Sequence, residues 1–325
     1  MLSFIKNNYY RISSRKEYII TSLILTMVSI YLAVLLTSSL ELKGNIALVT
    51  NKSEEMFKSN YIKINIMSNE PPTSELLLGK YDGVIVDKGH GEYEVNTIKG
   101  EEFKEILEAF IKNPKEFKPE SKDIRGVGTN IIGYLLMFLL LQSILYMFTL
   151  GDDMELKQIE RIIASPVSLF KYMLSHFIVV FLLIFLPSFF ILTVMKGILG
   201  FNIGFSLIQY AVILSIVISL GVSFAMFLNS LIKVSDKTNM MGSAIVILTT
   251  ILAGSFYSFE KRNKILESAL WILPQKSILS FVQGLEGKRE VYSMIPELFY
   301  VIIISIGFYI IATLKIKKDY IVRKD

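Results

Sequence analysis

Residues 151–171, GDDMELKQIERIIASPVSLFK, form a charged stretch between two long apolar runs. The flanking runs, 129–150 and 172–195, are each long and apolar enough to cross a bilayer as a helix, which takes about 20 residues. We therefore expect the charged stretch to lie at a membrane face and to join two membrane-spanning helices.

The charged stretch itself has the pattern of a short amphipathic helix. Asp152 and Asp153 stand where a new helix would begin, a position at which carboxylates interact favourably with the helix dipole. Apolar and polar residues then follow at helical spacing: Ile159, Ile162 and Ile163 on one side, and Glu155, Glu160 and Arg161 on the other. Ser165 and Pro166 end the pattern, because proline disfavours helix at the residue before it. A plain linker helix on the membrane surface is the alternative interpretation.

The composition indicates a polytopic membrane protein rather than a soluble enzyme. Hydrophobic residues make up 52% of the chain. Cysteine is absent, which excludes disulfides and thiolate metal sites, and the two histidines, His90 and His176, are interpreted as structural. We therefore expect this chain to bind no metal or cofactor.

Six apolar runs predict six transmembrane helices; they are 18–36, 129–150, 172–195, 205–232, 240–257 and 298–314. The first run could be a signal peptide, but its long apolar core favours a retained helix. Lysine and arginine concentrate in the segments that this order puts on one side, including 1–16 and the C-terminal tail. This bias predicts cytoplasmic N- and C-termini, and it reflects membrane orientation rather than nucleic-acid binding.

Residues 40–128 form the one substantial polar part of the chain and predict a small α/β domain. Four short β-branched or alternating runs, GNIALVT, YIKINIM, YDGVIVD and YEVNTI, have the pattern of strands, and residues 74–80 and 101–112 have helical spacing. The topology above makes this domain extracytoplasmic. It would lie between segment 1–39, in which a short helix on the cytoplasmic membrane surface (residues 1–16) precedes the first transmembrane helix, and the remaining membrane segment (129–325).

Residues 254–287 combine aromatic residues, prolines and glycines next to the last crossing. Neither half of the segment is long enough to span, so we interpret residues 258–287 as two short re-entrant helices separated by a break at Pro274. Trp271 suits a membrane interface. An amphipathic surface loop is the alternative.

Two motifs in this order resemble the ABC-2 family of ABC transporter permeases, over essentially the whole chain. The first motif comprises Glu155, Arg161, Ser165, Pro166, Val167 and Ser168, with Lys157 and Gln158 where the family has Gly-Thr. The second motif comprises Gly254, Phe256, Tyr257, Pro274 and Gly284, with Ser258 near the usual place of a proline. The large segment after the first helix resembles the subgroup with an extracytoplasmic insertion.

The resemblance implies the permease subunit of an ATP-driven exporter in a bacterial cell membrane. A separate ATPase subunit would bind ATP-Mg, and this chain contains no phosphate-binding G-x-x-x-x-G-K-[ST] motif. A second permease, identical or similar, would complete the transporter within the membrane lipid.

The resemblance also assigns roles to the two motif regions. Residues 151–168 become the ATPase-coupling helix, with Asp152, Asp153, Glu155, Ile159, Glu160, Arg161, Ile162, Ile163, Ser165 and Pro166 as its site residues. The outer segment becomes a re-entrant gate, with Gly254, Phe256, Tyr257, Trp271, Pro274 and Gly284.

The cargo is expected to be hydrophobic or amphipathic, such as a drug, an antimicrobial peptide or a lipid, because the crossings are so apolar. Two other functions stay open at this point. The outer domain could sense a ligand and signal through the helices, or the chain could belong to an ion (sodium) exporter. The scarcity of ionisable residues within the crossings disfavours ion transport.

Overall fold

The computed structural model describes residues 1–40, 45–50, 57, 62–77, 80–89, 92–97, 101–114, 126–256, 268, 270–287 and 289–321. The chain divides into two compact units. Unit 1 comprises Met1–Val34 and Arg125–Asp325, and unit 2 comprises Leu35–Ile124.

Unit 2 contains a mixed four-stranded sheet in the order β2-β1-β3-β4. Its elements are β1 (Asn45–Val49), β2 (Lys63–Met67), α3 (Thr73–Leu77), β3 (Gly83–Gly89), β4 (Glu92–Thr97) and α4 (Glu101–Lys112). β1 pairs in parallel with β2 and β3, whereas β3 and β4 are antiparallel. Each strand overlaps one of the four runs named above; β3 extends two residues beyond its run, and β4 starts one residue before its run.

Both faces of the sheet in unit 2 are covered. Alternate strand residues such as Ile46, Leu48 and Ile85 pack with Leu107 and Phe110 of α4, as expected for a strand whose side chains point to opposite faces. On the other face, Ala47 of β1 and Val84 of β3 pack with Leu76 of α3 and with Tyr81. The placement of this unit outside the cell stays a prediction.

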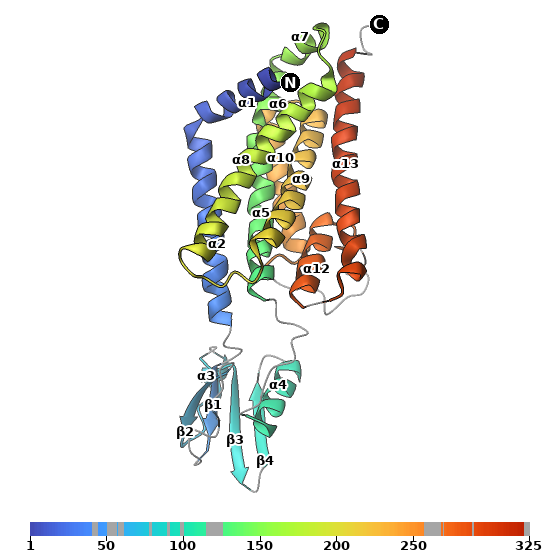
Figure 1. Ribbon diagram of the computed structural model, residues 1–325. Coiled ribbons are helices and arrows are strands. Elements are labelled where there is room, and N and C mark those ends of the chain that lie inside the picture. The colour runs from blue at the N-terminus through green and yellow to red at the C-terminus, as the bar shows by residue number, and fades with distance from the viewer. Residues whose placement is uncertain are drawn as a thin grey trace. The chain divides into compact units, whose positions relative to one another are not determined.

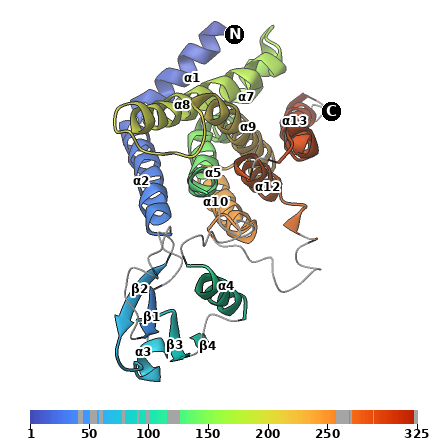
Figure 2. The same cartoon turned by 60° about the horizontal axis from the view of Figure 1, so that its bottom comes forward.

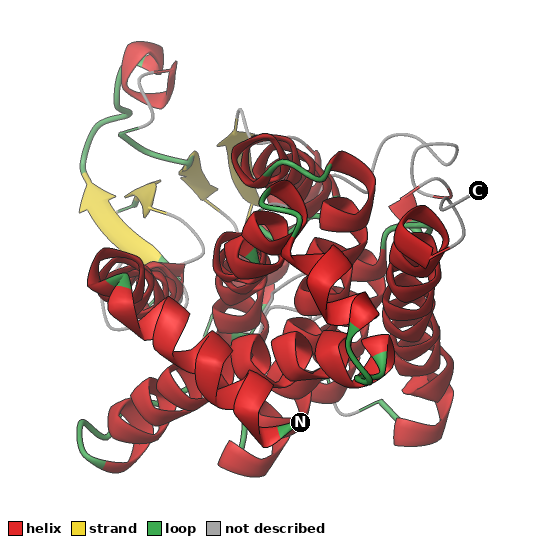
Figure 3. Ribbon diagram, turned by 90° about the horizontal axis from the view of Figure 1, so that it is seen from above, coloured by secondary structure: helices red, strands yellow, loops and turns green. Residues whose placement is uncertain are grey.

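Unit 1 consists of helices, and the described strands belong to unit 2 (Figure 3). The helices of unit 1 are α1 (Leu2–Ser14), α2 (Lys16–Leu40, of which residues up to Val34 belong to this unit), α5 (Val127–Tyr146), α6 (Phe148–Glu155), α7 (Gln158–Ala164), α8 (Leu169–Gly197), α9 (Leu207–Ile232), α10 (Ser235–Leu252), α12 (Pro274–Glu286) and α13 (Val291–Ile321).

Four helical stretches are long and apolar enough to cross a membrane: Val127–Glu155, Leu169–Gly197, Leu207–Ile232 and Tyr292–Tyr320. A fifth would be formed if Leu2–Ser14 and Ile19–Ala33, bent by 79° to each other, made one span. The chain is thus a mostly helical, polytopic membrane protein, and the count of six crossings stays a prediction.

The fifth predicted crossing, 240–257, differs most from the structure. The corresponding helix, α10, begins at Ser235 and ends at Leu252. It has 18 residues and starts with the polar sequence SDKTN, and it is not among the candidate spans. These polar residues form the first turn of α10, so the helix begins five residues before the apolar run.

Within unit 1, α5 and α9 are the inner helices. In the most apolar 18-residue segment of each helix, 72% of α5–α6 and 61% of α9 are buried, against 28% of α8 and 22% of α13. α5 lies among α8, α9, α10 and α12 (Figure 2). The outward side chains of α8 and α13 include Phe190, Phe299 and Ile303, which suit contact with lipid or with a second membrane chain.

The two ends of unit 1 carry different elements (Figure 1). α1, α6, α7 and the C-terminal part of α13 lie at one end, which we call the α7 end. α12 lies at the other end, which we call the α12 end, and the first turn of α5 is bonded to it there. The segment α5–α6 therefore runs the full length of the helical unit.

Candidate functional site

The charged stretch 151–171 contains parts of two helices joined by a tight turn. α5 passes into α6 through Met147, and α6 ends at Glu155. Lys157 then takes a left-handed conformation, with a φ of 56°, and α7 starts at Gln158. α7 ends at Ala164 and Ser165 is extended, which confirms the predicted stop before Pro166.

The prediction that Asp152 and Asp153 cap a new helix is wrong. Both residues lie in the second half of α6, and α7 has Lys157 at its N-cap with no side-chain cap. The helical stretch Val127–Glu155 continues through Met147 with little interruption, because residues 143–155 contain no proline. The two aspartates have other partners.

Asp153 is the centre of a buried polar cluster at the α7 end. Its side chain is 2% exposed, and its Oδ1 lies 2.7 Å from Nη1 of Arg11 in α1. Its Oδ2 accepts a hydrogen bond from the Tyr172 hydroxyl and lies 3.5 Å from Nε2 of His176, both in α8. The hydroxyl of Thr149 is 3.2 Å from the other ring nitrogen of His176. A buried carboxylate needs such partners, because desolvation is otherwise very costly.

The Asp153 cluster fixes α1 to the rest of the helical unit. Arg11 donates a second hydrogen bond, of 3.2 Å, to the Thr149 carbonyl. One turn earlier, Asn8 is buried and its amide lies 3.5 Å from the Ser175 hydroxyl. The ring of Phe4 contacts that of Tyr172 edge-on at 5.7 Å. α1 is a helix, as predicted, but one face of it packs on protein rather than on lipid.

Sequence reasoning missed this cluster. The signal was present in two patterns: Asn8 and Arg11 share one face of α1, and Tyr172 and His176 are one turn apart in a largely apolar helix. Polar residues at helical spacing on facing helices are typical of an interhelical contact in a membrane protein. His176 is structural, as interpreted, since it is fully buried.

α6 also packs closely on the turn between α9 and α10. A Cβ at Gly151 would lie 2.7 Å from Oδ1 of Asn229 and 3.1 Å from Ser235, so only glycine fits without a shift. Four residues on, Oε2 of Glu155 accepts a 3.3 Å hydrogen bond from the Ser235 amide. α6 therefore contacts both the end of α9 and the start of α10 directly.

α7 divides its residues between the protein core and the surface. Ile159 is fully buried in the core of unit 1, so the prediction that it anchors a partner is wrong for this arrangement. Ile162 and Ile163 are half-buried against the same core, whereas Glu160 and Arg161 are exposed. These two charges are therefore exposed at the surface of the α7 end.

The outer motif is only partly covered by the structure. Tyr257 and most of 257–269 lie outside the described residues, so the first of the two predicted re-entrant helices has no structural description here. Gly254 has a φ of 87°, and Phe256 packs edge-on against Tyr134 of α5 at 5.1 Å. Trp271 is 42% exposed.

The second predicted re-entrant helix corresponds to α12. It begins at Pro274, whose missing amide proton is tolerated at the first helical position. The helix thus starts at the residue where the sequence predicted a break between the two short helices. Gly284 packs on α13, because a Cβ there would lie 2.3 Å from Sδ of Met294. Pro274 and Gly284 thus have defined structural roles, and their part in a gate stays a prediction.

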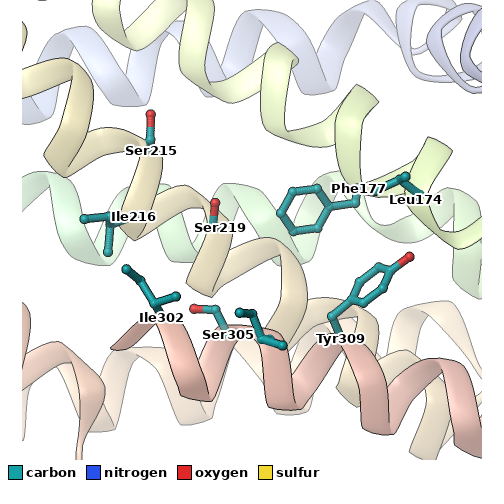
Figure 4. A pocket seen from close by; sticks show the side chains of 9 residues that line it. Leu174, Phe177, Ser215, Ile216, Ser219, Ile302, Ser305 and Tyr309 are labelled. Carbon is teal, nitrogen blue, oxygen red and sulfur yellow. The ribbon is translucent and has the colours of Figure 1, made fainter. Parts of the chain in front are cut away.

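A cavity of about 370 Å³ lies between α8, α9 and α13 (Figure 4). Its walls are formed mainly by apolar and aromatic side chains, together with three serines; the lining residues include Phe177, Tyr309, Ile216, Ile302, Ser215, Ser219 and Ser305. Ser215 and Ser305 donate hydrogen bonds to carbonyls of their own helices. None of the residues that line this cavity is charged.

Among the described residues, no group of three or more histidine, aspartate or glutamate side chains could hold a metal ion. A search of curated proteins found no match. A family model described as "ABC-2 family transporter protein" matches residues 39–314, most of the chain. The chain belongs to the ABC-2 family of transporter proteins.

Proposed function

We propose that this chain is the membrane permease subunit of an ATP-driven exporter and that α7, with the adjoining part of α6, receives the movement of the ATPase. Membership of the ABC-2 family makes the chain a membrane component that associates with an ABC ATPase. The observation that carries the coupling proposal is the fixed position of α6–α7. Asp153 and Gly151 hold α6 against α1, α8 and the α9–α10 turn, while Glu160 and Arg161 of α7 are exposed.

A coupling element must be rigid where it meets its own helices and polar where it meets its partner. The α6–α7 segment has both properties. Ile159 provides the rigid contact with the core, and the stop at Ser165 keeps the connection to α8 short. The exposed charges of α7 can form ion pairs with an ATPase surface, and such pairs set specificity and association rate.

The distribution of basic residues between the two ends of unit 1 supports an orientation for the protein. The α7 end carries Arg11 and Arg15 of α1, and Lys233 forms an ion pair of 2.5 Å with Asp319 near the end of α13. Because lysine and arginine are enriched on the cytoplasmic side, we assign this end to the cytoplasm of a bacterial cell membrane. Both termini would then be cytoplasmic, and residues 40–128 would be outside.

The cavity between α8, α9 and α13 supports the proposed cargo class. Its volume of about 370 Å³ falls within the range of small-molecule sites, roughly 300 to 1,000 Å³. Because its walls are apolar with a few hydroxyl groups, they suit a hydrophobic or amphipathic cargo such as a drug, an antimicrobial peptide or a lipid. An uncharged cavity offers little to stabilise a dehydrated sodium ion.

The working transporter would contain two permeases and two ATPase subunits, because closed two-fold symmetry is the commonest arrangement of such subunits. The apolar outward faces of the helices could supply the second permease contact. The proposal is tested by purifying the tagged permease from its native membrane. We expect an ABC ATPase at one copy per permease and ATP-dependent movement of an amphipathic probe in vesicles. A permease that never retains an ATPase would refute the proposal.

A further inference from the structure

The last residue of α12, Glu286, is bonded to the first turn of α5. Its Oε1 accepts a 2.9 Å hydrogen bond from the Gly128 amide. Its Oε2 accepts hydrogen bonds from the Thr129 amide at 3.0 Å and from the Thr129 hydroxyl at 2.6 Å. α5 has Gly126 at its N-cap and no side-chain cap of its own. Glu286 therefore satisfies amides that a helix start leaves unpaired, and it places a negative charge at the positive end of the α5 dipole.

The contact between Glu286 and α5 depends on glycines on both sides of it. A Cβ at Gly126 would lie 2.1 Å from Cδ of Glu286. Gly204, with a φ of 81°, comes so close that a Cβ there would lie 2.4 Å from the Gly128 amide nitrogen. The carboxylate thus sits in a closely packed pocket of backbone, where a shift of α5 displaces α12 as well.

α12 has two further side-chain links. Near its start, Gln275 donates a 2.9 Å hydrogen bond to the hydroxyl of Thr249 in α10. In its middle, Ser280 donates a 2.9 Å hydrogen bond to Glu297 in α13. These links join α12 to α10 and α13, whereas the Glu286 contact bonds it to α5, the helix that continues into α6 and α7.

We propose that Glu286 is a positioning residue for transport, and that it ties α12 to the start of α5 so that displacement of α7 is passed to the other end of the molecule. The helical stretch Val127–Glu155 is followed by the two-residue turn to α7 at one end and is bonded to Glu286 at the other, so the movement crosses one short turn. This inference rests on the proposed coupling role of α7. It assigns to Glu286 the link between the ATPase side and the predicted re-entrant gate.

The experiment uses the absence of cysteine from the chain. Ser277 of α12 is 3% exposed, so a single Ser277→Cys substitution reports on whether α12 leaves its site. The labelling rate with a thiol reagent is measured in the purified permease–ATPase complex, without nucleotide and with ATP-Mg. With Glu286 in place, we expect slow labelling that changes when ATP-Mg is added.

Glu286→Ala should accelerate labelling about 5- to 30-fold, the range expected for loss of a helix-capping side chain. The rate should no longer respond to ATP-Mg. ATPase binding and basal ATP hydrolysis should stay, whereas stimulation of hydrolysis by cargo should be lost. Glu286→Gln keeps one acceptor oxygen and should be intermediate. The control is Glu290→Ala, which removes the same charge from an exposed residue and should change nothing.

The proposal is overturned if Glu286→Ala keeps the slow, nucleotide-dependent labelling, or if it behaves like Glu290→Ala. Should Glu286→Ala fail to accumulate in the membrane, Glu286→Gln and Thr129→Val preserve the packing and decide the same question. Wild-type behaviour with both of these variants would also overturn it. The effect of Glu286→Ala on the labelling rate can also be measured in the permease without an ATPase. Failure of the proposed function would be seen separately, because the purified wild-type permease would then retain no ATPase.

Discussion

The Arg11–Asp153 ion pair allows a quantitative prediction, because both groups are well defined. Asp153 is 2% exposed and Arg11 is 25% exposed. Arg11→Ala removes the 2.7 Å contact with the carboxylate and the 3.2 Å hydrogen bond to the Thr149 carbonyl. Breaking a buried pair costs about 3 to 5 kcal/mol. The remaining Tyr172 hydrogen bond and the partial exposure of Arg11 reduce this to about 2 to 4 kcal/mol.

The cost of Arg11→Ala should appear as detachment of α1 from α8. Asn8 lies on the buried face of α1 and is 2% exposed, so an Asn8→Cys reporter in this cysteine-free chain should be protected from thiol reagents. A destabilisation of about 2 to 4 kcal/mol predicts labelling faster by about 30-fold or more. Arg11→Lys keeps the charge but has a different donor geometry, and it should have a smaller effect.

A double-mutant cycle and a control make the Arg11 prediction refutable. Asp153→Asn combined with Arg11→Ala should cost less than the sum of the two single substitutions. Each single substitution leaves the other charge without its ion-pair partner, whereas the double variant removes both charges. Lys6→Ala removes an exposed positive charge from the same helix and should change labelling little. If Arg11→Ala and Lys6→Ala gave the same labelling rate, the reasoning about the buried cluster would be refuted.

Three further predictions concern the α6 contact, the cavity and the orientation. Gly151→Ala should force α6 away from the α9–α10 turn at a cost of about 1 to 3 kcal/mol and reduce cargo-stimulated ATP hydrolysis, whereas Gly197→Ala, with open space around it, should not. Ser219→Phe should fill the cavity and lower transport with ATPase binding intact, whereas Ser219→Ala should leave transport unchanged; equal transport by both would argue against the cavity as a cargo site. Lys88→Cys should react with an impermeant thiol reagent in intact cells and Lys318→Cys should not, and the opposite pattern would reverse the assigned topology.

The helical elements could be predicted from the sequence, because their signals are local. Apolar runs of about 20 residues mark helices regardless of what they contact. The stop at Pro166 and the start at Pro274 follow from the chemistry of proline. The start of α10 was misplaced by five residues, since a polar sequence such as SDKTN is compatible both with a turn and with the exposed first turn of a helix.

The site could be located from the sequence but its contacts could not. The roles of Asp153 and Ile159 were misassigned, because a pattern along one helix does not show which face another helix covers. Arg11 and Asp153 are 142 residues apart in the chain, and Gly128 and Glu286 are 158 residues apart. Pairings at such separations depend on how the helices pack, which no local pattern determines.

The central claim, that α7 receives the movement of the ATPase, is tested most directly by ATPase binding and ATP hydrolysis in the reconstituted complex. Arg161→Glu reverses an exposed charge, and insertion of two glycines after Ala164 loosens the exit from α7. Both should leave membrane insertion intact and weaken coupling; loss of a desolvated interface charge pair costs about 2 to 5 kcal/mol. Lys171→Glu, an exposed charge outside α7, is the control and should keep normal coupling. Full ATPase binding, cargo-stimulated hydrolysis and transport in both α7 variants would contradict the account.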